Sequence, residues 1–374
     1  MTEVSPGLEN VYIKYTALTY IDGDKGIMRY RGYDINELAG KSSFEEVSYL
    51  MLFGELPDEN ELQNFKNQIN KNLKLPDYMK NILKELPEKA DSLGIFQTVL
   101  SARSSVESNY KYSEENDSKI VPEILGNVLS IVANIYRLKS GKDIIDPVPG
   151  KNYASTFLRA CFDKIDDDKI DAIDAALILY MDHEIPASTT SALVTASTLS
   201  DMYSSLVSAI TALRGPLHGG AAEGAYKQFL EIKTPENVDP WFNKNIIEDK
   251  KRLIGLGHRV YRTYDPRLTS FKKYADKLST TPDQKNILEI AKRLEVLGVK
   301  TFSPKGIYTN TDFYSGIVFN AIGFPVDMFT TLFGLSRVSG ILAHIIEYVE
   351  KQERLIRPRA IYNGYDRRDY KKQN

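Results

Sequence analysis

The segment 187–213 is the feature of this sequence that most restricts how the chain can fold. Apart from Asp201 it contains no Asp, Glu, Lys or Arg, and it consists largely of Ala, Ser, Thr and medium-sized apolar residues. A helical segment of this kind has no charged face for solvent, and its small side chains allow neighbouring helix backbones to come close. Its frequent Ser and Thr make it a poor membrane span. We therefore expect it in a helical core or, preferably, at the interface of a homodimer.

Helical spacing of apolar residues continues along most of the chain. The stretches 167–182 and 329–354 place apolar residues three and four apart, which is typical of amphipathic helices. The opening stretch 11–33 differs, because it is rich in β-branched and aromatic residues and has an Asp-Gly pair at 22–23 between apolar runs. The sequence therefore predicts a mainly α fold with a small N-terminal β element.

A run of turn-forming residues at 215–220, Gly-Pro-Leu-His-Gly-Gly, interrupts the helical pattern. It predicts a domain boundary near residue 214. The more charged region that follows has the features of a second, smaller helical unit, after which long helices return. We expect a large domain formed by residues 1–214 and 319–374, with a small domain formed by 215–318.

Composition excludes several classes of protein. Lys and Arg number 48 against 50 Asp and Glu in 374 residues, so no global basic field exists for nucleic acid or an anionic membrane surface. The single cysteine, Cys161, rules out an intrachain disulfide, and the start at Met1 shows no secretory leader. The longest apolar stretch, 317–335, is broken by Gly, Pro and Asp. We expect a soluble, cytoplasmic protein that binds neither nucleic acid nor membranes.

The chain has four histidines, and three of them lie at breaks in the helical pattern. These are His183, His218 and His258, and such breaks are where ligands are usually bound. Pro186 ends a helical run just after His183, which places His183 at a helix C-terminus. The fourth, His344, lies inside an amphipathic pattern and is expected to be an ordinary core or surface residue.

His218 precedes a helix that is expected to begin near 219–220. Unpaired N–H groups and the positive end of the helix dipole disfavour an imidazolium there, so a neutral ring is expected. Such a ring can donate a hydrogen bond to a carbonyl oxygen that gains negative charge, and the glycines let a ligand approach the main chain. The alternative is a Gly-Pro turn with an incidental histidine.

The stretch 255–267 combines one histidine with three arginines in a turn-forming segment. Arg267 offers a planar fork that matches a carboxylate. Arg259 and Arg262, together with the basic residues 250–252, could neutralise phosphates. This density suits a polyanionic ligand, although a basic loop taken alone is equally well explained as solvated. The two glycines match neither the Walker nor the dinucleotide-binding spacing.

Three further polar residues stand out. Asp312 lies just ahead of an apolar helix, where it could cap the helix or act as a base whose basicity rises as water is excluded. Arg337 is expected at the start of the helix 338–349. Arg357 precedes Pro358, so its backbone is extended and its side chain is free to reach outward. A surface arginine is the alternative for each.

Six ordered blocks of the sequence resemble citrate synthase, and more closely its shorter archaeal and bacterial form, over essentially the full length. The blocks are Asp182-His183-Glu184, 215–221 (GPLHGGA), 257–261 (GHRVY) with 265–267 (DPR), 310–316 (NTDFYSG), Ser336-Arg337 and 357–359 (RPR). The resemblance implies a nearly all-α homodimer in which a small domain closes over a cleft beside a large one. It also implies that acetyl-CoA, oxaloacetate and water give citrate and free CoA.

The resemblance further implies roles for individual residues. Asp312 is similar to the base that removes a methyl proton from acetyl-CoA, and His218 to the donor that holds the thioester oxygen. His258 resembles the acid that protonates the oxaloacetate keto oxygen. The residues that resemble carboxylate-binding groups for oxaloacetate or citrate are His183, Arg267, Arg337 and, reaching into the partner subunit's site, Arg357. The candidates for CoA contacts are Leu256, Gly257, Arg259, Arg262 and Lys305.

The resemblance implies neither a metal nor a resident cofactor, because arginines take the place of a cation and the CoA thioester is itself a substrate. It also implies that domain closure follows oxaloacetate binding and assembles the acetyl-CoA site, so binding is expected to be ordered. One departure is found around Asn310, where Thr309 and Thr311 replace the Pro and Val that are common in the family. This departure concerns the local shape of the loop.

Alternative functions stay open from the sequence. A 2-methylcitrate synthase, or an enzyme with dual activity, uses the same residues on propanoyl-CoA, so the motifs do not separate the two. A metal-dependent helical hydrolase would need His-Glu-x-x-His spacing, which fails because position 187 is Ala. A catalytically silent dimeric binding protein is disfavoured because the catalytic positions are all filled.

Overall fold

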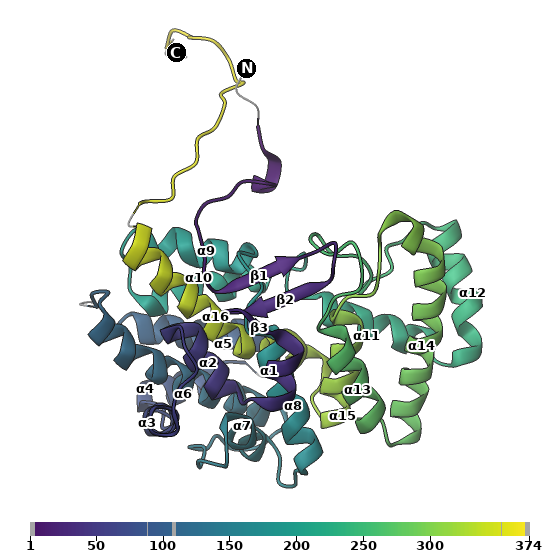
Figure 1. Cartoon of the computed structure of the whole chain (residues 1–374), viewed down its shortest axis with the longest axis horizontal. Helices are drawn as coiled ribbons and strands as arrows, with labels where there is room; N and C mark the ends of the chain where they lie inside the picture. The colour runs from purple at the N-terminus through teal and green to yellow at the C-terminus, as the bar shows by residue number, and fades with distance from the viewer. Residues whose placement is uncertain (1–3, 88, 107–109, 353, 371–374) are drawn as a thin grey trace, which may run out of the picture.

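The computed structural model describes residues 4–87, 89–106, 110–352 and 354–370. Within them the chain is mainly helical, with a small antiparallel sheet near its start. The strands are β1 (Thr19–Asp22), β2 (Ile27–Tyr30) and β3 (Tyr33–Asp34), in the order β1-β2-β3 (Figure 1). The predicted mainly α fold with an N-terminal β element is confirmed.

The β1–β2 hairpin forms at the expected Asp-Gly pair. In the turn, the Asp22 carboxylate accepts a hydrogen bond from the Lys25 N–H at 3.0 Å. A Cβ atom on Gly23 would lie only 2.2 Å from the carbonyl oxygen of Val260. Glycine is therefore required here, because it lets the hairpin tip lie directly against the basic loop 255–267.

Helices α1 to α8 form much of the larger body of the molecule, on the left in Figure 1. Several begin at a side-chain cap, such as Ser43 for α2, Asp58 for α3 and Asp166 for α8, each of which accepts an N–H of the first turn. The bounds are α1 Ile35–Lys41, α2 Phe44–Phe53, α3 Glu59–Lys71, α4 Asp77–Glu85, α5 Ser92–Ser104, α6 Glu114–Lys139, α7 Tyr153–Cys161 and α8 Asp167–Tyr180.

The charge-free segment forms two helices, α9 (Ala187–Ala196) and α10 (Met202–Leu213). Leu199 adopts a left-handed φ of 62° between them, and Asp201 caps the first turn of α10. Helix α10 packs against α9, α5 and α16. Within the single chain the side of α9 that carries Val194 is exposed, so its burial by a second copy stays a prediction.

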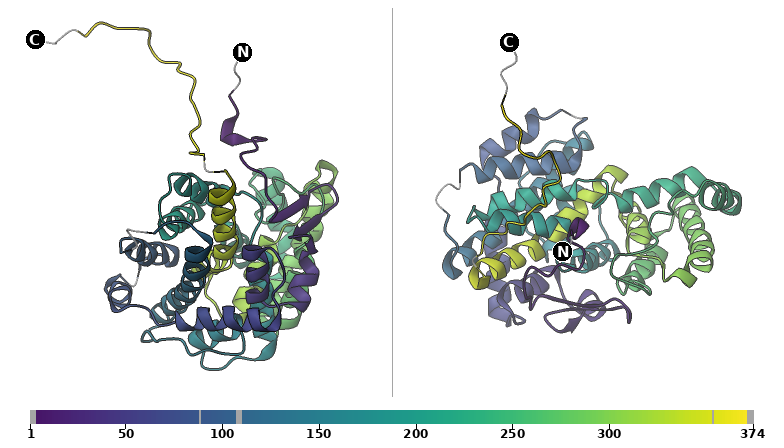
Figure 2. Two further views of the ribbon diagram at one scale, coloured as in Figure 1. Left: turned by 60° about the vertical axis from the view of Figure 1, so that its left-hand side comes forward. Right: turned by 90° about the horizontal axis from the view of Figure 1, so that it is seen from above.

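Helices α11 to α15 lie together on the other side of the molecule, and α16 runs back through the larger body (Figures 1 and 2). The bounds are α11 Ala221–Ile232, α12 Val238–Phe242 followed by a π-helical turn Asn243–Glu248, α13 Leu268–Leu278, α14 Pro282–Phe302, α15 Asp312–Ile322 and α16 Phe329–Gln352. Helix α11 begins at Ala221, close to the start expected near 219–220. The proposed domain limits at 215 and 318 stay a prediction.

Two helix ends differ from the sequence analysis. Helix α8 ends at Tyr180, whose carbonyl accepts a hydrogen bond from the Arg337 side chain at 2.6 Å instead of from a further helical N–H. His183 therefore lies beyond the helix and not on its last turn. Arg337 does not begin its helix, because α16 starts at Phe329 and carries Arg337 buried in its interior.

Two helices within the described residues are long and apolar enough to cross a membrane, namely Glu114–Lys139 and Val326–Lys351. Their most apolar windows are 83% and 89% buried inside the molecule. Core helices of soluble proteins have the same length and composition, so these helices are weak evidence for a membrane span.

Two buried carboxylates connect helix N-termini in the larger body. Glu45 accepts a hydrogen bond from the Tyr153 N–H at 2.7 Å at the start of α7, and Asp174 accepts one from the Phe44 N–H at 3.1 Å at the start of α2. Each carboxylate thus satisfies an N–H group that has no partner within its own helix. Burial, followed by the charge of Glu45, raises the pKa of Asp174 to about 8.

The raised pKa makes stability depend on pH. Between its ordinary pKa of 3.8 and about 8, Asp174 binds a proton more strongly in the folded than in the unfolded chain, so the free energy of unfolding falls as pH rises through this range. The variant Asp174→Asn keeps the oxygen that accepts the Phe44 N–H. In this variant we expect the free energy of unfolding no longer to fall with rising pH. In the unsubstituted chain the fall amounts to at most about 1.4 kcal/mol per pH unit.

Urea unfolding at pH 5 and pH 8 measures the effect. The exposed Asp167→Asn on the same helix is the control, and it should keep the pH dependence of the unsubstituted chain. An equal pH dependence in Asp174→Asn and the unsubstituted chain would contradict the assignment.

Candidate active site

Buried positive charge joins the candidate residues into one neighbourhood, although their segments lie far apart in the chain. The charge of Arg267 acts on the pKa of His258, and the charge of Arg337 acts on that of His218. Both charges act on the remaining two candidates, which are His183 and Asp312. The three histidines and Asp312 come from four segments. These segments are the residues after α8, the loop 255–267, the turn before α11 and the start of α15.

The two arginines are almost completely buried, with exposed fractions of 4% for Arg267 and 2% for Arg337. Arg267 donates to both oxygens of Asp265, at 2.9 and 2.7 Å. Burial alone would lower the pKa of Arg267, but the charge of Asp265 outweighs burial and raises this pKa. Arg337 donates only to a backbone carbonyl and forms no ion pair with a carboxylate among the described residues, and burial lowers its pKa to about 10. The charge of Asp182 offsets this burial only in part. Because a partly compensated buried charge is costly, this site is suited to an anionic ligand.

His183 lies in this pocket of positive charge. Its ring centroid is 4.9 Å from that of His258, and its Nε2 lies 3.2 Å from the Tyr261 hydroxyl. Burial and the charge of Arg267 hold the pKa of His183 well below its ordinary value. His183 is therefore neutral at physiological pH and can bind a ligand by hydrogen bonding.

The tautomer of His218 follows from its hydrogen bonds. The backbone N–H of Ser188, which can only donate, points to His218 Nε2 at 3.2 Å, and the Ser188 hydroxyl lies 2.8 Å from the same nitrogen. Nε2 is therefore the acceptor, and the proton is on Nδ1. Since Ser188 lies in the first turn of α9, the ring caps that helix. Burial and the charge of Arg337 lower the pKa of His218 to about 4, in line with the expected neutral ring.

His258 has the opposite tautomer. Its Nδ1 accepts the backbone N–H groups of Val260 at 3.0 Å and Tyr261 at 3.3 Å, so the proton is on Nε2. Burial and the charge of Arg267 lower the pKa of His258 to about 4. In each neutral ring the proton is therefore on the nitrogen opposite the one that accepts a backbone N–H, where it can be donated to a ligand oxygen.

Asp312 is the first residue of α15 and is only partly exposed. Its carboxylate accepts a hydrogen bond from the Tyr180 hydroxyl at 3.1 Å. Burial raises the pKa of Asp312, although the charge of Arg267 and the Tyr180 hydrogen bond oppose the increase. The carboxylate thus faces other groups instead of capping its helix, which is the arrangement required of a base.

Asn310 holds the loops of His258 and Asp312 together. Its amide group donates to the Gly257 carbonyl at 2.7 Å, and its side-chain oxygen accepts the Asp312 N–H at 3.0 Å. Its own N–H donates to the Gly255 carbonyl at 3.0 Å. The neighbouring Thr309 and Thr311, which depart from the usual family residues, are buried and leave these bonds intact.

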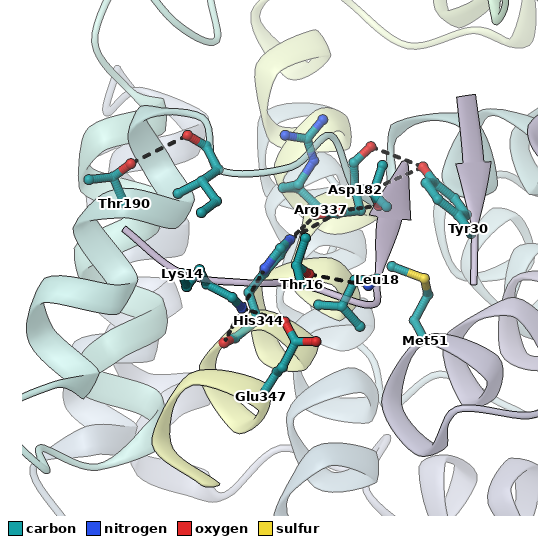
Figure 3. Close-up of polar contacts among 12 residues, drawn as sticks. Lys14, Thr16, Leu18, Tyr30, Met51, Asp182, Thr190, Arg337, His344 and Glu347 are labelled. Carbon is teal, nitrogen blue, oxygen red and sulfur yellow. Dashed lines mark hydrogen bonds and ion pairs between the residues drawn. The ribbon is translucent and has the colours of Figure 1, made fainter. Parts of the chain in front are cut away.

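A buried polar network surrounds Asp182, the residue that precedes His183 in the chain (Figure 3). His344 Nε2 lies 3.2 Å from the carboxylate of Asp182, while Lys14 Nζ lies 3.1 Å from His344 Nδ1 and 2.6 Å from the Glu347 carboxylate. An ammonium group can only donate, so Nδ1 accepts and the Nε2–H donates to Asp182. His344 is thus a core histidine with satisfied hydrogen bonds, as expected.

One stripe of α16 carries the groups that contact this segment. Arg337, Gly340, His344 and Glu347 follow one another at helical spacing. A Cβ atom on Gly340 would lie 2.2 Å from the Met181 carbonyl oxygen, so glycine permits the close approach. The same helix face therefore supplies the buried Arg337 and supports the backbone before His183.

The candidate CoA residues fall into two groups. Arg259, Arg262 and Lys305 have exposed side chains. The Leu256 side chain is buried, and Gly257 adopts a left-handed φ of 86°. A ligand could therefore reach the cations through their side chains, but Leu256 and Gly257 only through their backbones.

The structure does not bring Arg357 to the other candidates within one chain. Arg357 is exposed in the extended segment after α16, where the adjacent Ile356 N–H donates to Ser197 Oγ at 3.0 Å beyond the end of α9. This segment continues away from the body on the same side as the N-terminal residues (Figures 1 and 2). Its role in a partner's site stays a prediction.

No group of three or more His, Cys, Asp or Glu side chains in the described part of the chain is arranged to hold a metal ion. The positive charges of the site are those of Arg267 and Arg337.

Sequence analysis missed several supporting residues. Asp265 and Asn310 each lie two positions before a candidate, and the blocks 265–267 and 310–316 included them without giving them a role, so proximity in sequence was a usable signal. Tyr180 and Ser188 gave no such signal, because their partners are 132 and 30 residues away. Only the folded chain reveals them.

Comparison with known proteins agrees with this geometry. Residues 7–359 match the family model described as "Citrate synthase, C-terminal domain". The chain is 54% identical over 372 residues to a citrate synthase of Saccharolobus solfataricus, covering 99% of this chain and 98% of the relative, and 50% identical over 373 residues to one of Thermoplasma acidophilum, covering 98% and 97%. A solved ternary complex of the Thermoplasma acidophilum enzyme with carboxymethyl coenzyme A and oxaloacetate is 49% identical, with a TM-score of 0.96 and coverage of 99% and 98%.

The network around Asp182 leads to a prediction about stability. Burial alone would raise the pKa of Asp182, but His344 and Arg337 outweigh it and lower that pKa. Removing the donor with His344→Ala leaves a buried carboxylate short of a partner, so we expect a loss of about 3 kcal/mol in the free energy of unfolding.

Urea unfolding at pH 7 measures this loss. His344→Gln is the matched variant, because it keeps an N–H donor for Asp182 and should lose clearly less. Equal stability losses in the two variants would show that the hydrogen bond to Asp182 is not what matters.

Proposed function

Since this chain belongs to the citrate synthase family, we propose that its buried arginines, histidines and aspartate carry out the condensation of acetyl-CoA with oxaloacetate and water to citrate and free CoA. The observation that carries the proposal is the pair of neutral imidazoles with opposite tautomers beside two buried guanidinium groups. Such a site offers two hydrogen-bond donors for developing negative charge and positive charge for a dicarboxylate.

Oxaloacetate binds first in this proposal. Its two carboxylates are held by Arg267 and Arg337, and His183 adds a hydrogen bond. The substrate charge compensates the buried charge of Arg337, which has no carboxylate partner among the described side chains. Binding of the dianion therefore lowers the electrostatic cost of burying the Arg337 charge.

Enolisation of acetyl-CoA needs a base and an oxyanion donor acting together. Asp312 removes a proton from the methyl group while the Nδ1–H of His218 donates to the thioester oxygen. A carbon acid this weak is not ionised by a carboxylate alone, so the oxygen must be stabilised as negative charge develops. The raised pKa of Asp312 strengthens it as a base.

His258 acts on the second substrate. Its Nε2–H donates to the keto oxygen of oxaloacetate and transfers the proton as the enol carbon forms the new carbon–carbon bond. The two backbone N–H groups at Nδ1 keep that nitrogen unprotonated, so Nε2 is the nitrogen that faces the substrate. Water then hydrolyses the citryl thioester to citrate and CoA.

CoA is bound by exposed groups around this site. The side chains of Arg259, Arg262 and Lys305 are candidates for the phosphates, and the backbone of Leu256 and Gly257 is a candidate for the adenine. The small domain 215–318 closes over oxaloacetate before acetyl-CoA binds. Closure excludes water that would otherwise hydrolyse the thioester early.

The active form is a homodimer in this proposal. The uncharged side of α9 and α10 forms the seam, since burying it costs no charge desolvation. Arg357 reaches the oxaloacetate site of the partner subunit, because the segment after α16 extends away from its own body (Figure 2). We place the enzyme in the cytoplasm.

Acetyl-CoA is the favoured acyl donor over propanoyl-CoA, because the relatives named above are citrate synthases. A thiol-release assay of the purified chain with oxaloacetate tests this choice. We expect a higher kcat/KM with acetyl-CoA, and Asp312→Asn should lower kcat by about 10²-fold or more, since it removes the base. A higher kcat/KM with propanoyl-CoA would make the chain a 2-methylcitrate synthase instead.

The shared site is tested by mixing two defective chains. Arg357→Ala damages the partner's site and Asp312→Asn damages the chain's own site, so each homodimer should have little activity. A hybrid dimer contains one intact site, and co-expression of the two variants should recover about a quarter of the normal activity. If hybrids isolated by two affinity tags are as inactive as the parents, Arg357 does not act across the dimer.

A further inference from the structure

Tyr180 occupies a central place in the site without belonging to any of its recognised motifs. Its hydroxyl donates to Asp312 Oδ1 at 3.1 Å, and its carbonyl accepts from the Arg337 Nε–H at 2.6 Å. The guanidinium of Arg267 lies 5.9 Å from the centre of its ring. One buried residue at the end of α8 thus contacts the base and both carboxylate-binding arginines.

We infer that Tyr180 is a positioning residue for the proton-abstracting base, its hydroxyl holding one oxygen of Asp312 so that the other is directed at the methyl group of acetyl-CoA. The inference deepens the proposed function and rests on it. The Asp312 N–H is held separately by the Asn310 side chain at 3.0 Å, so the backbone and the carboxylate of the base are fixed by different partners.

The hydroxyl is suited to this task because it stays protonated. Burial, followed by the negative charge of Asp312, raises the pKa of Tyr180 well above its ordinary value. The phenol is therefore protonated and able to donate at physiological pH. A hydrogen bond to a charged acceptor is stronger than one to a neutral group, so it restricts rotation of the carboxylate more than packing alone.

The ring and the hydroxyl of Tyr180 have separable roles. The ring packs against Phe271 at 5.2 Å and Phe333 at 4.8 Å between centroids, and it faces Arg267. The contact with Arg337 uses only the backbone. Tyr180→Phe therefore leaves the oxaloacetate-binding groups in place and removes the hydroxyl, which contacts the base and also interacts with the side chains of Thr311 and Ser315.

The charged and titratable groups that face Asp312 are Tyr180 of α8, Asp265 and Arg267 before α13, and Arg337 of α16. Helices α11 and α14 also pack against α15, and their acids have other partners: Glu223 accepts from Thr330, and Glu295 accepts from Tyr314. Tyr180→Phe alters none of these charges. A change in the titration of the base in this variant thus reports on the hydroxyl.

The test is a comparison of steady-state kinetics and pH profiles for Tyr180→Phe and the unsubstituted chain. We expect kcat to fall about tenfold at pH 7.5, while KM for oxaloacetate changes less than about twofold. Because the hydrogen bond stabilises the ionised base, its loss raises the pKa of Asp312. The low-pH side of the kcat profile, its acid limb, should therefore move to higher pH. Exchange of the acetyl-CoA methyl protons with D₂O should slow by the same factor as kcat.

Tyr203→Phe is the matched control. Tyr203 is also buried, donates its hydroxyl to the Glu123 carboxylate at 2.9 Å and has the Arg103 guanidinium 4.9 Å from its ring centre, but it lies in α10 away from the base. This variant should lose stability while its acid limb stays in place. Tyr180→His, which keeps a ring N–H donor, should retain more of kcat than Tyr180→Phe.

Two results would overturn the inference. One is a Tyr180→Phe enzyme that does not show the expected change. Either its kcat and the low-pH side of its kcat profile match those of the unsubstituted chain, or its kcat falls while KM for oxaloacetate rises in parallel and the low-pH side of the profile does not move. The other, decisive also if Tyr180→Phe does not fold, is a Tyr180→His enzyme that has lost the enolisation step entirely while oxaloacetate still binds normally. Absence of citrate formation by the unsubstituted chain would instead overturn the proposed function, and the inference with it.

Discussion

Buried positive charge is the constraint on which the rest of this site depends. Arg267 has a carboxylate partner in Asp265, but Arg337 donates only to a backbone carbonyl, and the charge of Asp182 offsets its burial only in part. Burial lowers the pKa of the neighbouring histidines, and the charges of the two arginines lower it further. The buried charge therefore contributes to the neutral state of the histidines and suits the site to an anionic ligand.

Neutral imidazoles have a second, local cause in the backbone. His218 accepts an N–H of the first turn of α9, and His258 accepts two N–H groups of its own loop. In each ring the nitrogen that faces the protein is the acceptor, so the other nitrogen keeps its proton. Hydrogen bonds that serve local folding thus also determine which atom can donate to a substrate oxygen.

The sequence predicted much of this arrangement, but not all of it. The charge-free segment, the turn at 215–220 and the arginine-rich loop pointed to a helical fold and to His218, His258 and Arg267, because composition and turn chemistry are local properties. Tyr180 lies in an ordinary apolar helix pattern, and its partner Asp312 is 132 residues away, so no local rule reveals it. Likewise, the interior position of Arg337 depends on where α16 begins, and helix starts after proline-containing turns are poorly fixed by periodicity.

The tautomers of His218 and His258, the two histidines proposed to act in catalysis, are the most direct test of the account. The chain has only four histidines, so ¹⁵N NMR of the imidazole nitrogens can be assigned with single His→Gln variants. Since burial lowers the pKa of His218 and His258 to about 4, we expect both to be neutral between about pH 6 and 8, with the proton on Nδ1 of His218 and on Nε2 of His258. An imidazolium at either residue in this range, or the reverse tautomer, would contradict it.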